Sequence, residues 1–314
     1  MLIYTFQRIG LSLLICFTSM CLLFAAIHAI PGDPATIMLG TRANPEMLER
    51  LRQEMGFDQP LPVQLLNFFG RIVQGDFGTD LWSKRDVGTI IMENLPNTLI
   101  LIAAALGWSA LLGIPLGCYS AIRRNTWIDR LTAILAVGTI SIPSFVVAIY
   151  ALLLFAVELN WFPVIGAGED GDVKDQIWHL VLPSFAVGLG WVGYLARIVR
   201  ASMLEVMGEN HIRTARAFGL TEPNIVLHYA LRIAILPTVT LLALAIGGLL
   251  SSTVFAENIF ARPGIGKLIV DAANVRNYPL VQGAVLTSVA MFALAMPISD
   301  LLVAWLDPRV RATF

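Results

Sequence analysis

Residues 210–237 read NHIRTARAFGLTEPNIVLHYALRIAILP, and they lie between two apolar runs that are each long enough to cross a bilayer. The segment is basic and amphipathic, and it is far longer than a chain needs in order to turn around at a membrane surface. We call residues 205–232, which contain most of it, the elbow. An ordered elbow of this length indicates that another component docks there and displaces it.

The elbow carries the signals of two short helices joined by a tight turn. A helix is predicted from Glu209 to Ala217, with Arg213 and Arg216 on a different side from an apolar stripe. That stripe holds Ile212 and Ala215, with Phe218 as a further candidate. Gly219 stands where a helix ends in the left-handed conformation, which other residues adopt at a cost of roughly 1 kcal/mol or more.

After the glycine turn, Thr221 is placed to cap the next helix, and Pro223 is tolerated in its first turn. A bent unit of this kind would transmit a displacement that a flexible loop would absorb. The alternative from spacing alone is an amphipathic helix held at anionic lipid headgroups by its arginines.

The composition of the 314-residue chain is that of a membrane protein, with 57% hydrophobic and 14% charged residues and a mean hydropathy of +0.74. A soluble domain of this length could not bury so much apolar surface. The net charge of −1 gives no indication of a nucleic-acid partner. The 3 cysteines lie in apolar runs without CxxC spacing and the 4 histidines are scattered, so we expect free thiols and no metal site.

Six apolar runs of about 20 residues predict six membrane-spanning helices. They cover approximately residues 9–30, 98–122, 131–157, 180–199, 233–256 and 280–305. The first run follows Arg8, as the core of a signal peptide would, but it exceeds the roughly 7–15 residues of such a core and lacks a small-x-small cleavage site. It is therefore interpreted as a retained first span.

The distribution of arginine predicts the orientation. In a six-span chain the turn after the second span, the elbow and the C-terminus fall on one side, and all three are rich in arginine. The acidic loop 169–175 falls on the other side. Positive residues usually concentrate in the cytoplasmic loops, and Arg262, Lys267 and Arg276 in the loop after the fifth span are a mild exception. Both termini and the elbow are therefore predicted to lie in the cytoplasm.

A long outer loop, residues 31–97, joins the first two spans and carries nine acidic and six basic residues. Asn44 is placed as a helix N-cap before Pro45, and Gly56 stands where that helix would end. A second helix is predicted over residues 62–74, with a stop at Gly75. Its apolar stripe is Leu65, Leu66, Phe69 and Ile72. The loop is either a lid on the membrane domain or a docking surface for an outer partner.

The elbow sequence HIRTARAFGL, residues 211–220, resembles a loop of inner-membrane permease subunits of ATP-binding-cassette (ABC) importers, in the dipeptide, oligopeptide and nickel branch. That loop typically reads YIRTARAKGL. The matching residues are Arg213, Thr214, Ala215, Arg216, Ala217 and Gly219, whereas His211 and Phe218 depart from it. The resemblance implies that residues 213–219 dock into a groove on a nucleotide-binding subunit.

The likeness extends over nearly the whole chain. Further matches are IPGDPA at 30–35, GDFGTD at 75–80, ENLPNTL at 93–99, SIPSF at 141–145, LARIVRASMLEVM at 195–207, VFAENIFARPGIGKLIVDA at 254–272, RNYPLVQG at 276–283 and DPRVR at 307–311. The family usually has aspartate where this chain has Asn277. The long first outer loop is most similar to that of the B-type member of the permease pair.

This resemblance implies an all-α polytopic membrane protein of the type I importer permease fold, in a bacterial inner membrane. The expected parts are a first span at 1–30, an outer loop at 31–97, a five-helix core with the elbow at 98–306 and a cytoplasmic tail at 307–314. The implied partners are a second similar permease, two ATPase subunits and an extracytoplasmic substrate-binding protein. Nucleotide and Mg²⁺ belong to the ATPase subunits.

The implied activity is import of dipeptides or oligopeptides, although relatives of this kind also handle glutathione, nickel chelates or sugars. From the residues themselves, the chain has no GxxxxGKS or GxxxxGKT loop to cradle phosphates. We therefore expect a transport subunit that is not itself an enzyme and that binds no cofactor.

Polar groups at membrane depth are candidates for a translocation path. Ser141 and Ser144 flank Pro143, which frees a backbone carbonyl and kinks a helix. Glu257 ends the fifth span, where it either lines an outer gate or anchors the loop. The other candidate hydroxyls are Ser251, Ser252 and Thr287. Each of these hydroxyls has ordinary helix packing as its alternative role. The small residues of the fifth span are interpreted as serving both internal packing and contact with a second permease.

Two other functions make different predictions. An ion-driven transporter or channel needs buried acids or histidines, and only Asp300 lies well inside a span, where pairing with an arginine is the alternative to proton relay. A membrane hydrolase needs a motif such as HExxH or GxSxG, and no predicted span has either.

Overall fold

The computed structural model describes residues 2–29, 31–40 and 44–306. Within them the regular structure is helical, apart from one bridge between Thr79 and Asp86. The helices are α1 (Leu2–His28), α2 (Pro34–Leu39), α3 (Pro45–Met55), α4 (Leu61–Val73), α5 (Val87–Ile122), α6 (Trp127–Ser141), α7 (Ser144–Ala151), α8 (Val173–Val206), α9 (Asn210–Ala217), α10 (Glu222–Asn224), α11 (Leu231–Ala234), α12 (Leu236–Ile259), α13 (Ile265–Asn274) and α14 (Tyr278–Leu306). Two π-helical segments, Leu152–Glu158 and Ile225–Ala230, follow α7 and α10.

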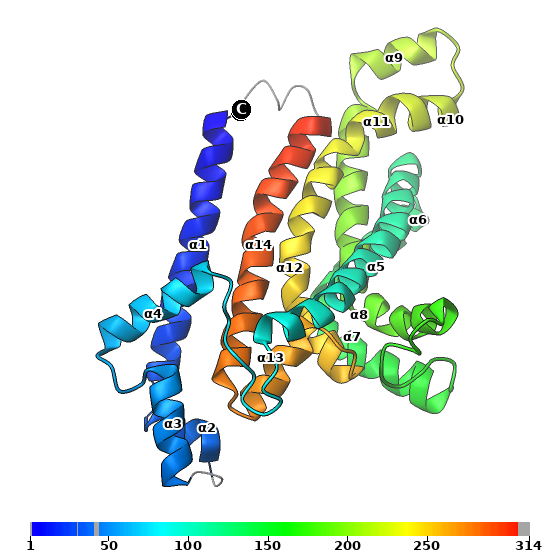
Figure 1. The fold of residues 1–314 in the computed structure, drawn as a ribbon. Coiled ribbons are helices and arrows are strands. Elements are labelled where there is room, and N and C mark those ends of the chain that lie inside the picture. The colour runs from blue at the N-terminus through cyan, green and yellow to red at the C-terminus, as the bar shows by residue number, and fades with distance from the viewer. Residues whose placement is uncertain (1, 30, 41–43, 307–314) are drawn as a thin grey trace. The chain divides into compact units, whose positions relative to one another are not determined.

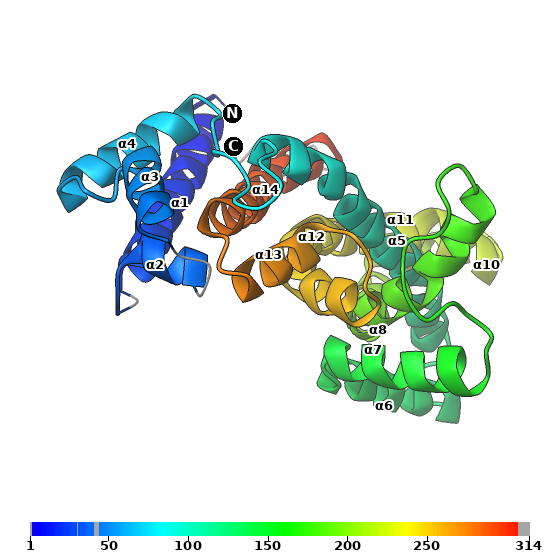
Figure 2. The same ribbon diagram turned by 60° about the horizontal axis from the view of Figure 1, so that its bottom comes forward.

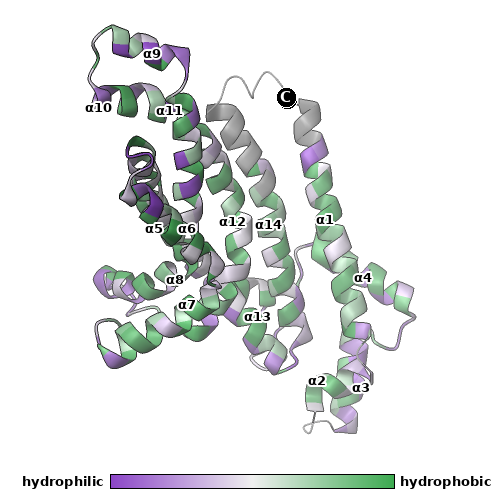
Figure 3. Ribbon diagram, turned by 180° about the vertical axis from the view of Figure 1, so that it is seen from behind, coloured by the Kyte–Doolittle hydropathy of each residue, from purple (hydrophilic) through white to green (hydrophobic). Residues whose placement is uncertain are grey.

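In the described part of the chain, five helices are long and apolar enough to cross a membrane. They lie in α1, α5, α8, α12 and α14 (Figure 1). The hydrophobic residues gather along these helices, and the hydrophilic residues gather on short helices such as α9 and α3 (Figure 3). A sixth span is present if the pair made by Trp127–Ser141 and Ser144–Glu158 is counted as one. The predicted all-α membrane fold is confirmed, with five spans or with six if this pair is counted as one span, and one predicted span has a different form.

The change concerns the third predicted span, residues 131–157, which was expected to be one kinked helix. The chain instead forms two helical pieces that meet at 96°. Ile142 takes an extended conformation (φ −88°, ψ 121°), because the ring of the following proline disfavours helix at the residue before it. Pro143 also has no N–H to donate, so the α6 hydrogen-bond ladder ends here. We call this point the α6–α7 break.

The chain divides into two compact units. The loop unit comprises Leu2–Thr98 and Pro263–Leu294. The elbow unit comprises Leu99–Arg262 and the chain from Ala295 onward. Each unit has its own buried side chains, and they are described separately.

In the loop unit, the predicted caps of α3 are confirmed. The Asn44 side chain accepts a hydrogen bond from the N–H of Met47 at 2.7 Å, and Gly56 ends the helix in the left-handed region at φ +70°. The predicted second helix is α4, which ends one residue before Gln74. Buried residues of α2 and α3 form a small core with Leu81. The outer loop therefore contains folded helical structure.

Helix α4 packs against α1 through aromatic rings, and α1 to α4 lie beside one another (Figure 2). The rings of Phe17 and Phe69 stack at 5.0 Å, and Phe68 lies 6.0 Å from Phe24. Phe68 is buried whereas Leu66 is 70% exposed, so the predicted apolar stripe of this helix was wrong at Leu66. The stripe is rotated because two adjacent phenylalanines both turn toward α1.

In the elbow unit, α8 is the central helix, and α6, α7 and α12 pack against it. It stays helical through Pro183 and buries a long series of small and apolar side chains. Ser109 of α5 donates to the backbone carbonyl of Gly188 at 2.8 Å, and the Trp108 indole donates to that of Ser184 at 2.9 Å. These bonds fix α5 against the middle of α8.

Candidate coupling elbow and membrane cavity

Helix α9 forms the first limb of the elbow and follows α8 closely in the chain (Figure 1). Ile212 is fully buried and Ala215 nearly so, which confirms these two as the apolar face. They join a hydrophobic cluster with the end of α8, to which Val199, Met203 and Val206 belong. The elbow is thus held to α8 by packing as well as by the chain.

The turn of the elbow has the predicted left-handed glycine. Gly219 has φ +80°, and the N–H of Leu220 donates back to the carbonyl of Ala215 at 3.3 Å. This is the pattern of a helix that closes on a glycine just beyond its end. No atom lies within 4 Å of a Cβ built on Gly219, so only the backbone conformation requires glycine here.

An ion pair closes the turn from outside. The Arg216 guanidinium donates from Nε to Oε1 of Glu222 at 2.7 Å and from Nη2 to Oε2 at 3.3 Å. The hydrogen bond from Arg216 holds the pKa of the Glu222 carboxyl below its usual value. Because both side chains are about half exposed, the pair adds less than about 1 kcal/mol of stability but fixes the direction of the turn.

The second limb runs through α10, the π-helical segment Ile225–Ala230 and α11. Its buried side chains belong to the same hydrophobic cluster as α9; they are Ile225, Val226, Ala230 and Ala234. The two limbs therefore form one packed helix–turn–helix unit in which Arg213, Thr214 and Ala217 remain on the exposed side.

Two details of the elbow were predicted wrongly. Phe218 is 82% exposed, because α9 ends at this residue and the glycine turn carries it away from the face of Ile212. Thr221 begins α10 with its backbone, but its side chain makes no capping hydrogen bond. Pro223 removes one of the two N–H groups that a capping side chain could bind.

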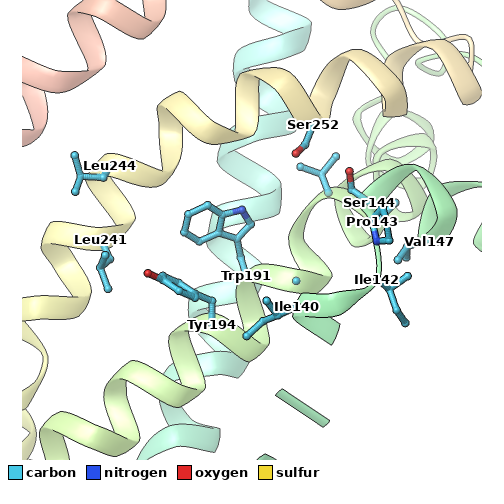
Figure 4. Close-up of a pocket in the computed structure, with 13 residues that line it drawn as sticks. Ile140, Ile142, Pro143, Ser144, Val147, Trp191, Tyr194, Leu241, Leu244 and Ser252 are labelled. Atoms are coloured by element: carbon cyan, nitrogen blue, oxygen red, sulfur yellow. The ribbon is translucent and has the colours of Figure 1, made fainter. Parts of the chain in front are cut away.

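A cavity of about 500 Å³ lies within the elbow unit, beside the α6–α7 break (Figure 4). Three helical regions contribute its walls. The lining residues are Ile140, Ile142, Pro143, Ser144 and Val147 around the break, Ala186, Val187, Gly190, Trp191 and Tyr194 of α8, and Leu241, Leu244 and Ser252 of α12. Most of the wall is apolar, with hydroxyls from Ser144, Tyr194 and Ser252.

Of the predicted path residues, the cavity brings together Ser144 and Ser252. Ser141 is exposed and donates to the carbonyl of Val137 at 2.8 Å, and Ser251 is also exposed outside the cavity lining. Glu257 is fully buried near the end of α12. Thr287 lies in the loop unit, where it donates to the carbonyl of Gly283 at 2.8 Å.

Sequence reasoning missed the aromatic wall of the cavity. Trp191 and Tyr194 are three residues apart on α8, which places them on one face of that helix. Their rings meet edge to face at 5.6 Å, and the Arg197 guanidinium lies 5.5 Å from the Tyr194 ring centre. The spacing of WVGY at 191–194 was the available signal.

Asp300 lies in α14, but its side chain and the 307–314 tail are outside the described residues.

Comparison with known proteins gives the family. The profile of the family described as "Binding-protein-dependent transport system inner membrane component" matches residues 113–312. The profile of the corresponding N-terminal region matches residues 1–102. The chain belongs to this family of membrane permease subunits, in the peptide, oligopeptide and nickel branch of the ABC importers, as the elbow sequence indicated.

Curated relatives match along nearly their full length. The chain is 38% identical over 292 residues to a protein named "Glutathione transport system permease protein GsiC" from Pectobacterium atrosepticum, which covers 93% of each chain. It is also 38% identical over 290 residues to the protein of the same name from Salmonella typhimurium, over 92% of each chain.

A solved structure shows the same fold. The MetNI methionine ABC transporter in an inward-facing conformation matches with a TM-score of 0.56. The match covers 69% of this chain and 96% of that chain, at 16% sequence identity. It supports the type I importer permease fold, and at this identity it carries no information on substrate.

Proposed function

We propose that this chain is the membrane subunit of an ATP-driven importer that moves dipeptides, oligopeptides or similarly built small peptides into the cytoplasm. The observation that carries the proposal is the elbow. It is a packed helix–turn–helix unit whose tip exposes an 82% accessible phenylalanine, Phe218, beside arginines. A rigid arm with an exposed aromatic tip suits docking against another protein, because aromatic side chains and arginines are typical anchors of interfaces.

The partners proposed here are two ATPase subunits at the elbow, a second permease of the same family and an extracytoplasmic binding protein. In this proposal both termini and the elbow lie in the cytoplasm, which the arginine distribution supports. Residues 213–219 would enter a groove on an ATPase subunit. ATP and Mg²⁺ would be held by the ATPase subunits, and this chain would bind no cofactor.

The cavity beside the α6–α7 break is proposed as part of the translocation path. A broken helix is tolerated at membrane depth where it is buried in protein or lines a cavity. Ser144 and Ser252 would offer hydroxyls to peptide groups, and Trp191 and Tyr194 would offer aromatic surface to side chains. The names of the relatives include glutathione, which is itself a small peptide, and this supports the proposed substrate class.

The elbow proposal is tested by replacing Gly219 with leucine. A side chain at φ +80° adds about 1–2 kcal/mol of backbone strain. This strain shifts the equilibrium between the closed turn and open conformations about 5- to 30-fold toward the open ones. We expect the complex reconstituted with its ATPase subunits to lose peptide-stimulated ATP hydrolysis and uptake, while the chain still inserts into the membrane.

The matched control for this test is Gly219→Asn, because asparagine tolerates the left-handed region. We expect it to keep most of the activity. Normal peptide-stimulated hydrolysis in the Gly219→Leu complex would contradict the proposed role of the elbow.

The outer loop gives a second test. Deleting residues 44–74 is expected to weaken capture from the binding protein, but the deletion also removes Phe68 from its packing against α1. A sharper variant reverses three exposed charges of α3, namely Glu46→Lys, Glu49→Lys and Glu54→Lys. If α3 docks the binding protein, we expect association to slow by about tenfold or more at low salt. An association rate and an affinity equal to those of the unaltered complex, measured by surface plasmon resonance, would favour a structural lid.

A further inference from the structure

An ionic cluster around a buried carboxylate joins three helices of the elbow unit at the end where α9 packs. Asp129, near the start of α6, is only 4% exposed. Its carboxylate accepts hydrogen bonds from Arg200 of α8, through Nε at 2.5 Å and Nη2 at 2.8 Å. Ser120 of α5 donates to the same carboxylate at 2.6 Å, and the backbone N–H of Asn125 donates at 3.0 Å.

This cluster differs in kind from the surrounding contacts. Two parallel bonds between a guanidinium and a carboxylate fix the relative orientation of the two groups as well as their separation. The additional donors from Ser120 and Asn125 satisfy the remaining carboxylate lone pairs, which a buried charge requires. Apolar contacts between helices have no such directional preference.

The position of Arg200 connects the cluster to the elbow. Val199 directly precedes Arg200 on α8 and Met203 follows it by about one turn, and both belong to the hydrophobic cluster that holds α9 through Ile212 and Ala215. At the other end of the connection, α6 runs from Asp129 to the α6–α7 break, where Pro143 and Ser144 line the cavity. A continuous set of packed and hydrogen-bonded groups therefore leads from the elbow to the break.

We propose that the Arg200–Asp129 pair transmits displacement of the elbow to the α6–α7 break, which makes Arg200 a positioning residue for transport that acts through Asp129. The proposal rests on the proposed function, in which the elbow receives the displacement. Motion of α8 at its elbow end then turns α6 as a rigid rod, because the bidentate bond prevents the two helices from sliding past each other. The break moves with α6 and reshapes the cavity.

The test compares Arg200→Lys with the unaltered chain in the full complex, reconstituted in proteoliposomes with its ATPase subunits and binding protein. Lysine keeps the positive charge beside Asp129, so the buried carboxylate remains paired, but it gives up the bidentate geometry. We expect ATP hydrolysis within twofold of normal and a fall of about tenfold in peptide transported per ATP hydrolysed. The control is Arg130→Lys, an exposed neighbour of Asp129, with an unchanged ratio.

A second readout reports the geometry directly. Spin labels on Ile134 of α6 and Glu205 of α8, both exposed positions, measure the separation of the two helices. We expect one narrow distance distribution in the unaltered complex, with and without nucleotide, and a broad one in Arg200→Lys. A narrow distribution with an unchanged transport ratio in Arg200→Lys would overturn the proposal.

Three further outcomes separate this inference from the proposed function. If Arg200→Lys lowers hydrolysis and transport in equal proportion, the pair only supports the fold and the inference fails. If Gly219→Leu loses peptide-stimulated hydrolysis and uptake whereas Arg200→Lys keeps the normal ratio of transport to hydrolysis, the elbow keeps its role and only this inference fails. If Gly219→Leu keeps normal peptide-stimulated hydrolysis, the proposed function of the elbow fails, and this inference fails with it.

Discussion

Replacing Gly193 with alanine is expected to destabilise the elbow unit by about 1–3 kcal/mol, although alanine is the better helix former. Gly193 lies where α8 touches α6. A Cβ built on it would lie 2.6 Å from the carbonyl oxygen and 2.9 Å from the Cα of Ala136, and it would also clash with the Thr139 hydroxyl. Because two of these atoms belong to the backbone, the helices themselves must separate.

Gly138→Ala is the matched control, since this glycine lies on α6 and has no atom within 4 Å of a built Cβ. There the gain in helix propensity, about 0.5–1 kcal/mol, is expected to dominate. Thermal unfolding of the two variants in detergent should therefore move in opposite directions from the unaltered protein. A Gly193→Ala variant as stable as Gly138→Ala would show that α6 and α8 are not closely packed.

The elbow is the part of the site that sequence reasoning predicted well, because its geometry is encoded locally. Glycine at position 219 predicts the left-handed turn by its residue type alone. The three-residue spacing of Ile212 and Ala215 predicts the buried face of α9. Phe218 was placed wrongly because it lies at the helix end, where the period stops applying. The two ends of α3 were also predicted from local sequence, its start from Asn44 and Pro45 and its end from Gly56.

The cavity was harder to predict, because its walls come from helices that are far apart in the sequence. Ser144 and Ser252 were found as hydroxyls at membrane depth, but nothing in their neighbourhoods distinguishes them from Ser141 or Ser251, which lie outside the cavity. Pro143 predicted that the third span is bent, but it did not predict the angle of the bend. A proline kink and a 96° break have the same local sequence signal, and the two pieces both pack against α8, which is distant in the sequence.

Long-range polar pairs were beyond prediction for a related reason. Asp129 and Arg200 are 71 residues apart, and Asp80 and Asn277 are 197 residues apart. Each of these residues alone has the sequence signature of an ordinary loop or helix-end residue. The family usually has aspartate where this chain has Asn277. Only the folded structure shows that Asn277 contacts Asp80 within the loop unit.

Restoring aspartate at this position is expected to destabilise the loop unit in a pH-dependent way. The Asn277 amide donates to the Asp80 carboxylate, and the two side chains are 1% and 6% exposed. Burial opposes the ionisation of Asp80, but hydrogen bonds from Ser83, Asn277 and Trp82 outweigh it and hold the pKa of the Asp80 carboxyl below its usual value. Asn277→Asp would place a second buried carboxylate against an ionised one.

Two such carboxylates raise the pKa of one of them, because like charges disfavour joint ionisation. The folded variant then binds more protons than the unfolded variant, so its free energy of unfolding falls as the pH rises. We expect Asn277→Asp to match the unaltered protein near pH 4 and to lose about 1–3 kcal/mol by about pH 7. Thermal unfolding of the purified chain across this pH range measures the difference.

Two controls separate charge from shape in this prediction. Asn277→Leu removes the same hydrogen bond without adding charge, so its loss of stability should vary little between about pH 5 and 7. Combining Asn277→Asp with Asp80→Asn exchanges donor and acceptor across the contact, and should restore most of the stability at neutral pH. If the exchanged pair is as unstable as the single variant, the repulsion between the carboxylates is not the cause and the contact with Asp80 does not determine the residue at this position.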